Sequence, residues 1–597
     1  MSFEFTSFAQ HAVSQVIMRL SNLTYLLPLA PFAARAFDCS PAAFQAILPE
    51  NATVAFAYPL AEGSTFNVPT GDIAYPRSPT ELPELCAVHI QVTSSASSHF
   101  GFGLFLPQSW NERFLATGNG GFAGGINWLD MAAGAKYGFA SISTDTGHNS
   151  TSGDITWALN QPERQKDWGY RAMHGSVDLA KQIVEKYYQC KPKFHYYSGC
   201  STGGRQGIRD IQLYPEDFDG VLAGAPAWWT THLQTWTAKI GLVNLPVDAS
   251  HHIPVDLFGA IGAEVLKQCD PQDGLVDTIV SDPEGCNFVP EALLCGANVT
   301  NQTAAGCLTV PQIGTLYKIY NDYVEANQTF VFPHLELGSE AQWPFLLGGA
   351  EPSSYGVQYV QDMVLNDTNW NFWDYNGTIV ELADQVDAGN ATADDFDLSP
   401  YYKRGGKLLQ YHGMSDALIA TGSSVVFYKD VLKTLIPKGI ELDSWYRLFL
   451  VPGMQHCAGT PTNVNAPWYF AGANQAGAIG ASTGSVHSVP GFMDAKHDAL
   501  LALMAWVENG TAPDEIVATK WKNDTLTDEV VRQRPLCPWP KQASKLLYQR
   551  SYRASKITYK ILEPALFLIT FLGIFADVVQ ARNLCNNSGK ILVSLVP

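Results

Sequence analysis

The sequence predicts an α/β protein, in which a sheet covered by helices is interrupted by one large insertion. Strand-like and helical hydrophobic patterns alternate between residues 110 and 213 and return after residue 396. Between residues 228 and 395 this alternation is lost, and Asn, Asp, Trp and Gly become frequent. Alternating patterns are typical of a sheet with helices on its faces. We therefore expect a main domain formed by residues 37–227 and 396–545, with residues 228–395 inserted as a cap domain.

Each predicted element has a local signal. Residues 40–110 contain short strand patterns broken by Pro and Gly, such as residues 86–93. A helix is predicted over residues 170–188, where Met173, Val177, Ala180, Ile183 and Val184 recur at helical spacing. The other predicted strands cover 114–117, 138–144, 195–198, 405–411 and 445–451, and the other predicted helices cover 207–213 and 494–506.

Composition limits the partners of this chain. Its 597 residues exceed one ordinary domain, and 46% hydrophobic residues indicate a packed core. Charged residues make up only 16%, and the formal net charge is −19. Because nucleic acids and anionic membrane surfaces attract positive patches, this negative charge argues against both as partners.

The N-terminus has the pattern of a secretion signal. Arg19 is followed by an apolar stretch and by small residues at Ala34 and Ala36. This pattern predicts a signal peptide over residues 1–36, cut after Ala36. Residues 1–17 precede the pattern, which favours Met18 as the true start. An apolar N-terminal strand or helix is the alternative.

Two residue counts favour the same compartment. The chain has eleven cysteines, and disulfides persist in oxidising compartments. The odd number leaves at least one thiol unpaired or bonded to another chain. We expect a secreted glycoprotein, since ten glycosylation sequons lie between the signal and the C-terminal tail, at Asn51, Asn149, Asn298, Asn301, Asn327, Asn366, Asn376, Asn390, Asn509 and Asn523.

Residues 546–597 form an atypical C-terminal tail. Its apolar run over residues 564–576 is thirteen residues long, whereas a helix that spans a bilayer needs about 20. We therefore expect a tail of unclear fold, with a membrane anchor as the less favoured alternative.

A nucleophilic serine is predicted at Ser201. The run Gly199-Cys-Ser-Thr-Gly203 fits the pattern G-x-S-x-G, with a strand before it and a helical pattern after it. In α/β-hydrolases such a serine sits on a sharp turn between strand and helix, where glycines avoid clashes. A Gly/Ser-rich surface turn is the alternative interpretation of the same run.

A general base and the residue that orients it should follow the serine in the order Asp, then His. Asp416 comes directly after the strand pattern of residues 405–411, and His456 comes after that of residues 445–451. His412 and His148 compete for the role of base. His412 precedes Asp416 on the same loop and so fits the order poorly. His148 precedes the serine and could instead line the site.

Two cysteines flank the proposed catalytic residues. Cys200 precedes Ser201, and Cys457 follows His456. If the serine and the histidine lie within hydrogen-bond reach, these cysteines can approach to the Cα separation of about 4.4–6.8 Å that a disulfide needs. The sequence thus predicts a disulfide that fastens the two catalytic loops together.

An oxyanion hole needs two backbone N–H groups near the developing negative charge. We expect one from Thr202, the residue after the nucleophile. The glycine-rich loop of residues 118–125 offers the other, from Gly120 or Gly121, because backbone without side chains can approach a substrate closely. The loop lacks the Lys-Ser/Thr ending of a phosphate-binding loop.

A metal site is the second chemical signal. Asp270, Asp273 and Asp277 surround Gly274, and oxygen ligands around a glycine turn suit Ca²⁺. The spacing is not that of an EF-hand. A solvated acidic loop is the alternative, and the flanking Cys269 and Cys286 would hold either arrangement rigid.

With these residues, the chain resembles the fungal tannase and feruloyl esterase family over about residues 37–540. The resemblance rests on the Ser201 motif extended to Gly207, on Tyr411-His-Gly-x-x-Asp416, on Gly453-Met-x-His-Cys457 and on the cysteine-bracketed acidic loop. It implies an α/β-hydrolase domain with a large lid, a triad of Ser201, Asp416 and His456, and the Cys200–Cys457 disulfide.

The resemblance also implies a structural calcium ion in the lid and three further disulfides. Its ligands would be the carboxylates of Asp270, Asp273 and Asp277 and the carbonyls of Leu275 and Ile279. The implied pairs are Cys39–Cys86, Cys269–Cys286 and Cys295–Cys307. The tail departs from the family and leaves Cys190, Cys537 and Cys585 without clear partners, which a gene-model error at the C-terminus would explain.

The leading functional prediction is hydrolysis of aromatic carboxylic esters outside the cell. Within the family, we favour hydroxycinnamoyl esters such as feruloyl-polysaccharide of plant cell walls. Galloyl esters, the substrates of tannases, are the alternative. A binding protein without activity should lack a triad residue, and none is missing here. A peptidase is disfavoured only by the resemblance, and the oligomeric state stays open.

Overall fold

The computed structural model describes residues 37–476, 492–525 and 529–543. The predicted signal peptide, the tail over residues 546–597 and Cys585 lie outside the described residues.

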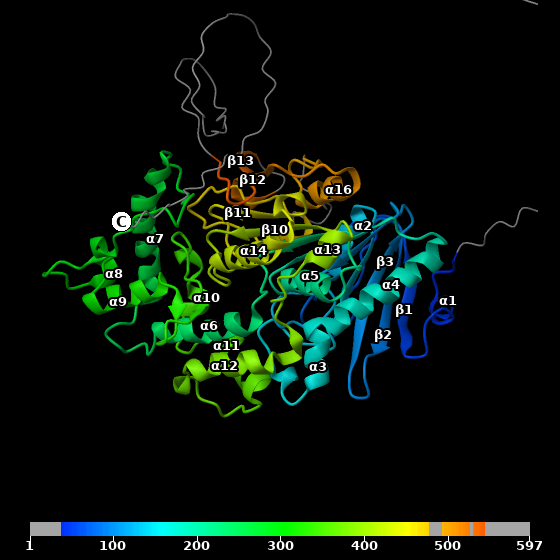
Figure 1. The fold of residues 1–597 in the computed structure, drawn as a ribbon, viewed down its shortest axis with the longest axis horizontal. Helices are drawn as coiled ribbons and strands as arrows, with labels where there is room; N and C mark the ends of the chain where they lie inside the picture. The colour runs from blue at the N-terminus through cyan, green and yellow to red at the C-terminus, as the bar shows by residue number, and fades with distance from the viewer. Residues whose placement is uncertain (1–36, 477–491, 526–528, 544–597) are drawn as a thin grey trace, which may run out of the picture. The chain divides into compact units, whose positions relative to one another are not determined.

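The main domain is built on one nine-stranded sheet (Figure 1). Its strands run in the order β1-β2-β3-β5-β4-β6-β7-β10-β11. Pairing is antiparallel from β1 to β5 and parallel from β5 to β11. The predicted α/β class is thus confirmed. The strands are β1 (Ala52–Leu60), β2 (Leu85–Thr93), β3 (His99–Pro107), β4 (Arg113–Thr117), β5 (Ala140–Thr144), β6 (Phe194–Cys200), β7 (Gly220–Gly224), β10 (Lys407–Gly413) and β11 (Tyr446–Val451).

Helices cover both faces of this sheet. On one face, α2 (Trp128–Lys136) and α16 (Ala499–Asn509) lie next to each other, because the hydroxyl of Tyr137 donates to Asp498 at the start of α16. On the other face, α4 (Ala172–Tyr188) packs against α5 (Thr202–Leu213). The other helices of the main domain are α1 (Pro41–Gln45), α3 (Pro162–Lys166), α13 (Ser399–Lys403), α14 (Gly422–Leu435) and α15 (Ala473–Ala476).

The core lies where the strands meet these helices. Leu115, Leu222 and Leu409 come from β4, β7 and β10, and they are fully buried against Leu503 and Trp506 of α16. Burial of one such side chain contributes about 1.5–3 kcal/mol. The parallel strands are buried on both faces, as expected for a sheet covered on both sides.

The insertion separates two neighbouring strands, β7 and β10 (green in Figure 1). It has its own apolar core, which includes Trp236, Ile261 and Trp343 and extends to Ile419 of the main domain. The insertion therefore packs directly on the loop that carries Asp416. Its elements are α6 (Thr230–Val243), α7 (Phe258–Cys269), α8 (Gln302–Ala305), α9 (Val310–Ile319), β8 (Tyr323–Val324), β9 (Phe330–Phe332), α10 (Pro344–Leu347), α11 (Ser354–Gln358) and α12 (Gly377–Val386).

A β-hairpin follows α16 and is formed by β12 (Ile516–Trp521) and β13 (Val530–Leu536). This hairpin contacts the predicted metal site, because Arg532 and Arg534 of β13 reach Asp277 in the acidic loop of the insertion. Among the described residues, no helix has the length and apolar character needed to cross a membrane.

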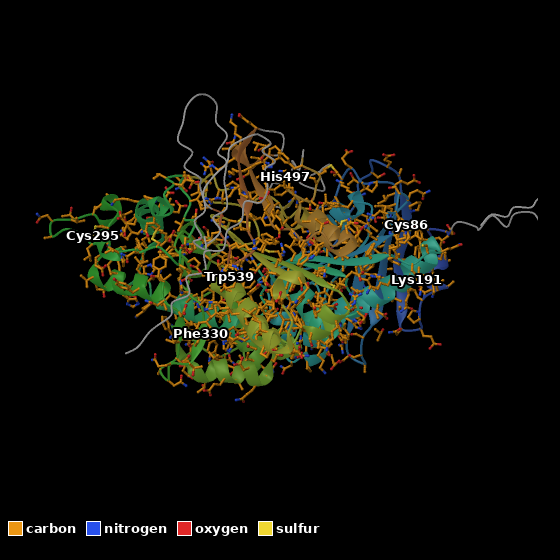
Figure 2. All side chains as sticks on the ribbon, turned by 45° about the horizontal axis from the view of Figure 1, so that its top comes forward. Cys86, Lys191, Cys295, Phe330, His497 and Trp539 are labelled. Carbon is orange, nitrogen blue, oxygen red and sulfur yellow. A yellow bond between two sulfur atoms is a disulfide. The ribbon has the colours of Figure 1, made fainter. Side chains whose placement is uncertain are left out.

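The disulfides hold both parts of the chain. Cys39 is bonded to Cys86 on β2, and Cys295 is bonded to Cys307 within the insertion (Figure 2 labels Cys86 and Cys295). Cys269–Cys286 and Cys200–Cys457 are also formed. All four predicted pairs are therefore present. Cys537 is disulfide-bonded too, whereas Cys190 is free and exposed.

Candidate active site

Ser201 occupies a strained turn between β6 and α5. Its φ of +63° and ψ of −123° belong to a region that residues with side chains rarely adopt. The turn is held from β7, because the Ser201 N–H donates to the Gly224 carbonyl at 2.9 Å. A Cβ on Gly199 would lie 2.7 Å from the carbonyl carbon of Gly203, so the turn closes only with glycine at position 199. The motif thus presents the serine hydroxyl at the carboxyl end of the sheet.

Asp416 and His456 follow the carboxyl ends of β10 and β11. Nδ1 of His456 lies 2.7 Å from Oδ2 of Asp416. In this arrangement Nδ1 carries the proton that it donates to the carboxylate, which leaves Nε2 as the basic nitrogen. The pair therefore has the chemistry of a general base with its orienting carboxylate.

Asp416 is completely buried, but protein groups donate hydrogen bonds to both of its carboxylate oxygens. Its Oδ1 accepts from the backbone N–H groups of Leu418 and Ile419 at 2.8 and 3.0 Å, and His412 Nε2 lies 3.0 Å from Oδ2. Burial alone would raise the pKa of Asp416, but His456 and His412 outweigh it, so that the pKa lies well below its ordinary value. Asp416 is thus held as a carboxylate.

Two of the three predicted catalytic residues open on one cavity of about 350 Å³, a volume typical of small-molecule sites, and Asp416 acts on it only through His456. Ser201 and His456 line it together with Thr202, Cys200 and Cys457. Within the described residues, the Ser201 hydroxyl makes no hydrogen bond to His456. Such contacts are often loose before a substrate binds.

The Cys200–Cys457 disulfide joins the elbow to the loop of the base. Its Cα atoms lie 6.0 Å apart, and 257 positions separate the two cysteines in sequence. The bond therefore fixes the spacing of the two residues next to it, Ser201 and His456.

Of the three predicted oxyanion donors, one is already used in a hydrogen bond within the protein. Thr202 begins α5, where a backbone N–H has no acceptor within the helix, and it lines the cavity. The N–H of Gly120 donates to the Tyr75 hydroxyl at 2.8 Å. Gly121 also lines the cavity, and within the described part of the chain its N–H has no acceptor. Of the two glycines, Gly121 therefore fits better.

The glycine loop is fastened to α5 through the Ser201 motif itself. Gln206 accepts from the Asn119 N–H at 3.0 Å, and its amide donates to the Asn119 side chain at 3.1 Å. Because Gln206 comes five residues after the nucleophile, the same helix positions the serine and the loop that faces it.

Neither of the two competing histidines is placed to act as the general base. His148 is buried against Trp157, its Nε2 is 2.9 Å from the Phe122 carbonyl oxygen, and burial lowers its pKa to about 4. His412 is fully buried between Asp416 and Ser424. Neither lines the cavity among the described residues.

The cavity also contains two polar residues that no sequence pattern indicated, Tyr75 and Asp130. Tyr75 comes from the segment between β1 and β2, and Asp130 comes from α2. Asn127 donates to Asp130 at 2.8 Å, and burial raises the pKa of Asp130 to about 7. Neither residue belongs to a motif, so only the three-dimensional structure reveals them.

The acidic loop folds around Asp270. Its carboxylate accepts from the N–H groups of Asp277 and Thr278 at 2.9 and 3.0 Å, and Gly274 takes a φ of +83°. Asp273 Oδ1 accepts from the Leu275 N–H at 2.8 Å. Oxygen atoms are the only side-chain donors that this loop brings to a cation.

The fit of a calcium ion to this loop rests on charge and on an unpaired atom. Asp277 pairs with Arg532 at 3.0 Å through Oδ2, while its buried Oδ1 has no hydrogen-bond partner. Asp270 and Asp273 form no ion pair within the described residues. Two described clusters have three metal-binding groups within 4.8 Å, and neither contains these aspartates. The donor chemistry therefore fits Ca²⁺, although the carboxylates are not gathered around one point.

This protein is an α/β-hydrolase. The class is defined by the mixed sheet, by the strained turn that carries the serine and by the buried Asp–His pair. The family model described as "Tannase and feruloyl esterase" matches residues 86–554. The chain belongs to this family and is a carboxylic ester hydrolase.

Individual relatives agree with this assignment. A probable feruloyl esterase B-1 of Aspergillus oryzae is 36% identical over 457 residues, which cover 76% of this chain and 80% of the relative. One from Aspergillus flavus is 34% identical over 488 residues, 80% of this chain and 88% of the relative.

Solved structures extend the comparison to the fold. The crystal structure of feruloyl esterase B from Aspergillus oryzae has a TM-score of 0.77 at 33% identity and covers 85% of this chain and 96% of its own. Tannin acyl hydrolase from Aspergillus niger, at 20% identity, has a TM-score of 0.66 over 88% of this chain and 97% of its own. This second likeness concerns the fold alone.

Proposed function

We propose that the chain is an extracellular serine esterase that cleaves hydroxycinnamoyl esters, such as feruloyl groups on plant cell-wall polysaccharide. The observation that carries this proposal is the His456–Asp416 pair, whose histidine lines the same cavity as Ser201. The relatives named as probable feruloyl esterases support the choice of acyl group.

In the proposed reaction, Ser201 Oγ attacks the ester carbonyl while Nε2 of His456 takes its proton. The N–H groups of Thr202 and Gly121 stabilise the oxyanion. His456 returns the proton to the leaving alcohol, and water then hydrolyses the acyl-enzyme with His456 again as base. Asp416 keeps Nδ1 protonated and stabilises the imidazolium that forms.

The lining of the cavity supports an aromatic acyl group with a phenolic hydroxyl. Apolar and aromatic side chains of the insertion and of the Asp416 loop form one part of the wall, namely Leu233, Phe345, Leu346, Tyr355, Leu418 and Ile419. Asp130 and Tyr75 provide polar groups elsewhere on the wall. Asp130 would hydrogen-bond the phenolic hydroxyl of the substrate, because its carboxyl group receives only an amide donor from the protein side chains.

The extracellular location is supported by disulfides and sequons. The Asn side chains of all ten sequons belong to exposed residues. Exposure is required for glycosylation. We also propose that the loop of Asp270, Asp273 and Asp277 holds a structural calcium ion, to which the carbonyls of Leu275 and Ile279 would contribute.

The test compares kcat/KM for methyl ferulate, methyl caffeate and methyl gallate in the wild type and in Ser201→Ala. We expect preference for ferulate or caffeate and a loss of about 10⁴-fold or more in the variant, as in other triad enzymes. Preference for gallate would make the chain a tannase. Undiminished activity of Ser201→Ala would contradict the catalytic assignment, and faster cleavage of a peptide amide would contradict the esterase assignment.

A further inference from the structure

A second cluster of metal-binding groups lies in the insertion and contains none of the catalytic residues. His334 follows β9, Glu336 comes two residues later, and Glu284 reaches them from the loop after Cys269. Nε2 of His334 lies 3.8 Å from Glu336 Oε2 and 3.9 Å from Glu284 Oε1. All three ligand atoms lie within 4.8 Å of one another. A tetrahedral ion with bonds of about 2.0–2.2 Å holds its ligands about 3.3–3.6 Å apart, so a small inward movement of these side chains would bring all three onto one ion.

The imidazole of His334 is already oriented for a metal. Oδ1 of Asp322 lies 2.7 Å from Nδ1 and also accepts from the His334 backbone N–H at 3.1 Å. A carboxylate on one ring nitrogen fixes the tautomer and directs the other nitrogen to the metal. In this cluster the directed nitrogen is Nε2, the atom that faces both glutamates.

Glu336 is a buried acid that lacks a partner of its own. The residue is only 4% exposed, and within the described residues its carboxylate accepts no hydrogen bond. Burial and the negative charge of Glu284 raise its pKa to about 8. A buried carboxylate needs a proton or a cation, because an uncompensated charge is costly in the interior. Among the described residues its one ion-pair contact is with His334, at 3.8 Å, and Asp322 already holds that ring.

We propose that His334, Glu336 and Glu284 bind one divalent metal ion of the zinc class, with Asp322 positioning the imidazole. The imidazole distinguishes this site from the acidic loop, because nitrogen ligands favour Zn²⁺ and its neighbours over Ca²⁺. Water would complete the coordination shell.

The ion would have a structural role next to the active site. The segment after Glu336 leads to Gln342, whose side-chain oxygen accepts from the N–H groups of Ala417 and His456 at 3.0 and 3.4 Å. A metal that fixes His334 and Glu336 would therefore fasten the segment that supports both catalytic loops.

The test is a calorimetric titration of Zn²⁺ into the full chain after chelation. We expect saturable binding at one site, a rise of Tm with Zn²⁺, and loss of both effects in His334→Ala and Glu336→Gln. Asp322→Asn should weaken binding about 10- to 100-fold, as loss of an outer-shell carboxylate does.

Two control variants locate the site. His497→Ala removes a histidine whose Nδ1 lies 2.9 Å from Asp494, its one carboxylate partner in the described part of the chain, and His497 lies away from Phe330 of β9 in Figure 2. Asp273→Asn alters the acidic loop, which lines the same cavity as the cluster. Both should bind Zn²⁺ like the wild type. The proposal is overturned if the wild type shows no saturable binding, if Glu336→Gln binds unchanged, or if Asp273→Asn abolishes binding.

Discussion

His412 and His456 contact the same oxygen atom of Asp416, at 3.0 and 2.7 Å. The buried carboxylate is therefore fixed from two sides, by the base that it orients and by a second histidine that touches no substrate. His412 is itself held by the Ser424 hydroxyl, 2.7 Å from Nδ1. It acts as a positioning residue for Asp416.

Replacing His412 should weaken both the fold and the reaction. His412→Ala removes a hydrogen bond to a charged group, which is worth about 1.5–3 kcal/mol. We expect a lower free energy of unfolding in urea and a lower kcat with little change of KM, because the substrate does not contact His412. Ser424→Ala, one step further away, should show the same effects more weakly. An unchanged kcat in His412→Ala would contradict the positioning role.

Asp416 also makes a prediction about acid stability. Its pKa is depressed in the folded state, whereas an unfolded aspartate titrates near 3.9. Between these two values the unfolded chain binds more protons, so the stabilisation by Asp416 is complete above about pH 4 and is lost as the pH falls towards the folded pKa. Thermal unfolding from pH 7 to pH 3 should show this fall of Tm. The fall should be shallower in His412→Ala, since that variant depresses the pKa less.

The sequence predicted the catalytic residues well because each has a local signal. Ser201 lies in a glycine motif, and Asp416 and His456 each follow a buried strand pattern. Tyr75 and Asp130 reach the same cavity only through tertiary packing, which no local pattern encodes.

Two helix boundaries show the same limit. The predicted helix at 494–506 begins only at Ala499. Asp498 is its N-cap, and the preceding Asp494 accepts from the His497 N–H in a turn of its own. The helix predicted from residue 207 begins at Thr202. Glycines disfavour a helix in isolation, but here close packing requires them: a Cβ would lie 3.0 Å from the Asn119 carbonyl oxygen at Gly203 and 2.5 Å from the Gly224 carbonyl oxygen at Gly204.

Asp130 should decide the preference for phenolic substrates. In Asp130→Asn we expect kcat/KM for methyl ferulate to fall about tenfold or more, from a lost hydrogen bond of about 1.5–3 kcal/mol. Methyl cinnamate, which has no phenolic hydroxyl, should be cleaved as by the wild type. Equal losses on both esters would show that Asp130 does not contact the hydroxyl.

The same substitution has a pH signature. Because the folded pKa of Asp130 is raised to about 7, the folded state holds the proton more tightly, and stability declines as the pH rises towards 7. Asp130→Asn should lose this decline, which thermal unfolding at pH 5 and pH 8 would measure.

The Cys200–Cys457 disulfide should contribute to activity as well as to stability. Replacing both cysteines by serine should lower the free energy of unfolding by about 2–5 kcal/mol and reduce kcat, since the spacing of Ser201 and His456 is released. The control is Cys295→Ser with Cys307→Ser, which opens a short loop in the insertion. That variant should keep the wild-type kcat at a temperature where it is folded. A fully active Cys200/Cys457 variant would contradict the role of the bond in the site.

Calcium removal should destabilise the chain through the acidic loop. With free Ca²⁺ at about 100 times Kd, a bound ion stabilises the folded state by about 2.7 kcal/mol, so the calcium chelator EGTA should lower Tm and added Ca²⁺ should restore it. Asp270→Asn should start from a lower Tm and no longer respond, because Asp270 is the buried carboxylate around which the loop folds. EGTA also removes Zn²⁺, so the readout specific to the loop is the recovery of Tm when Ca²⁺ alone is added back. His334→Ala should keep this recovery in full, since His334 lies outside the loop. A wild-type Tm that EGTA leaves unchanged would instead make this segment a calcium-free acidic loop held by Cys269–Cys286 and by Arg532.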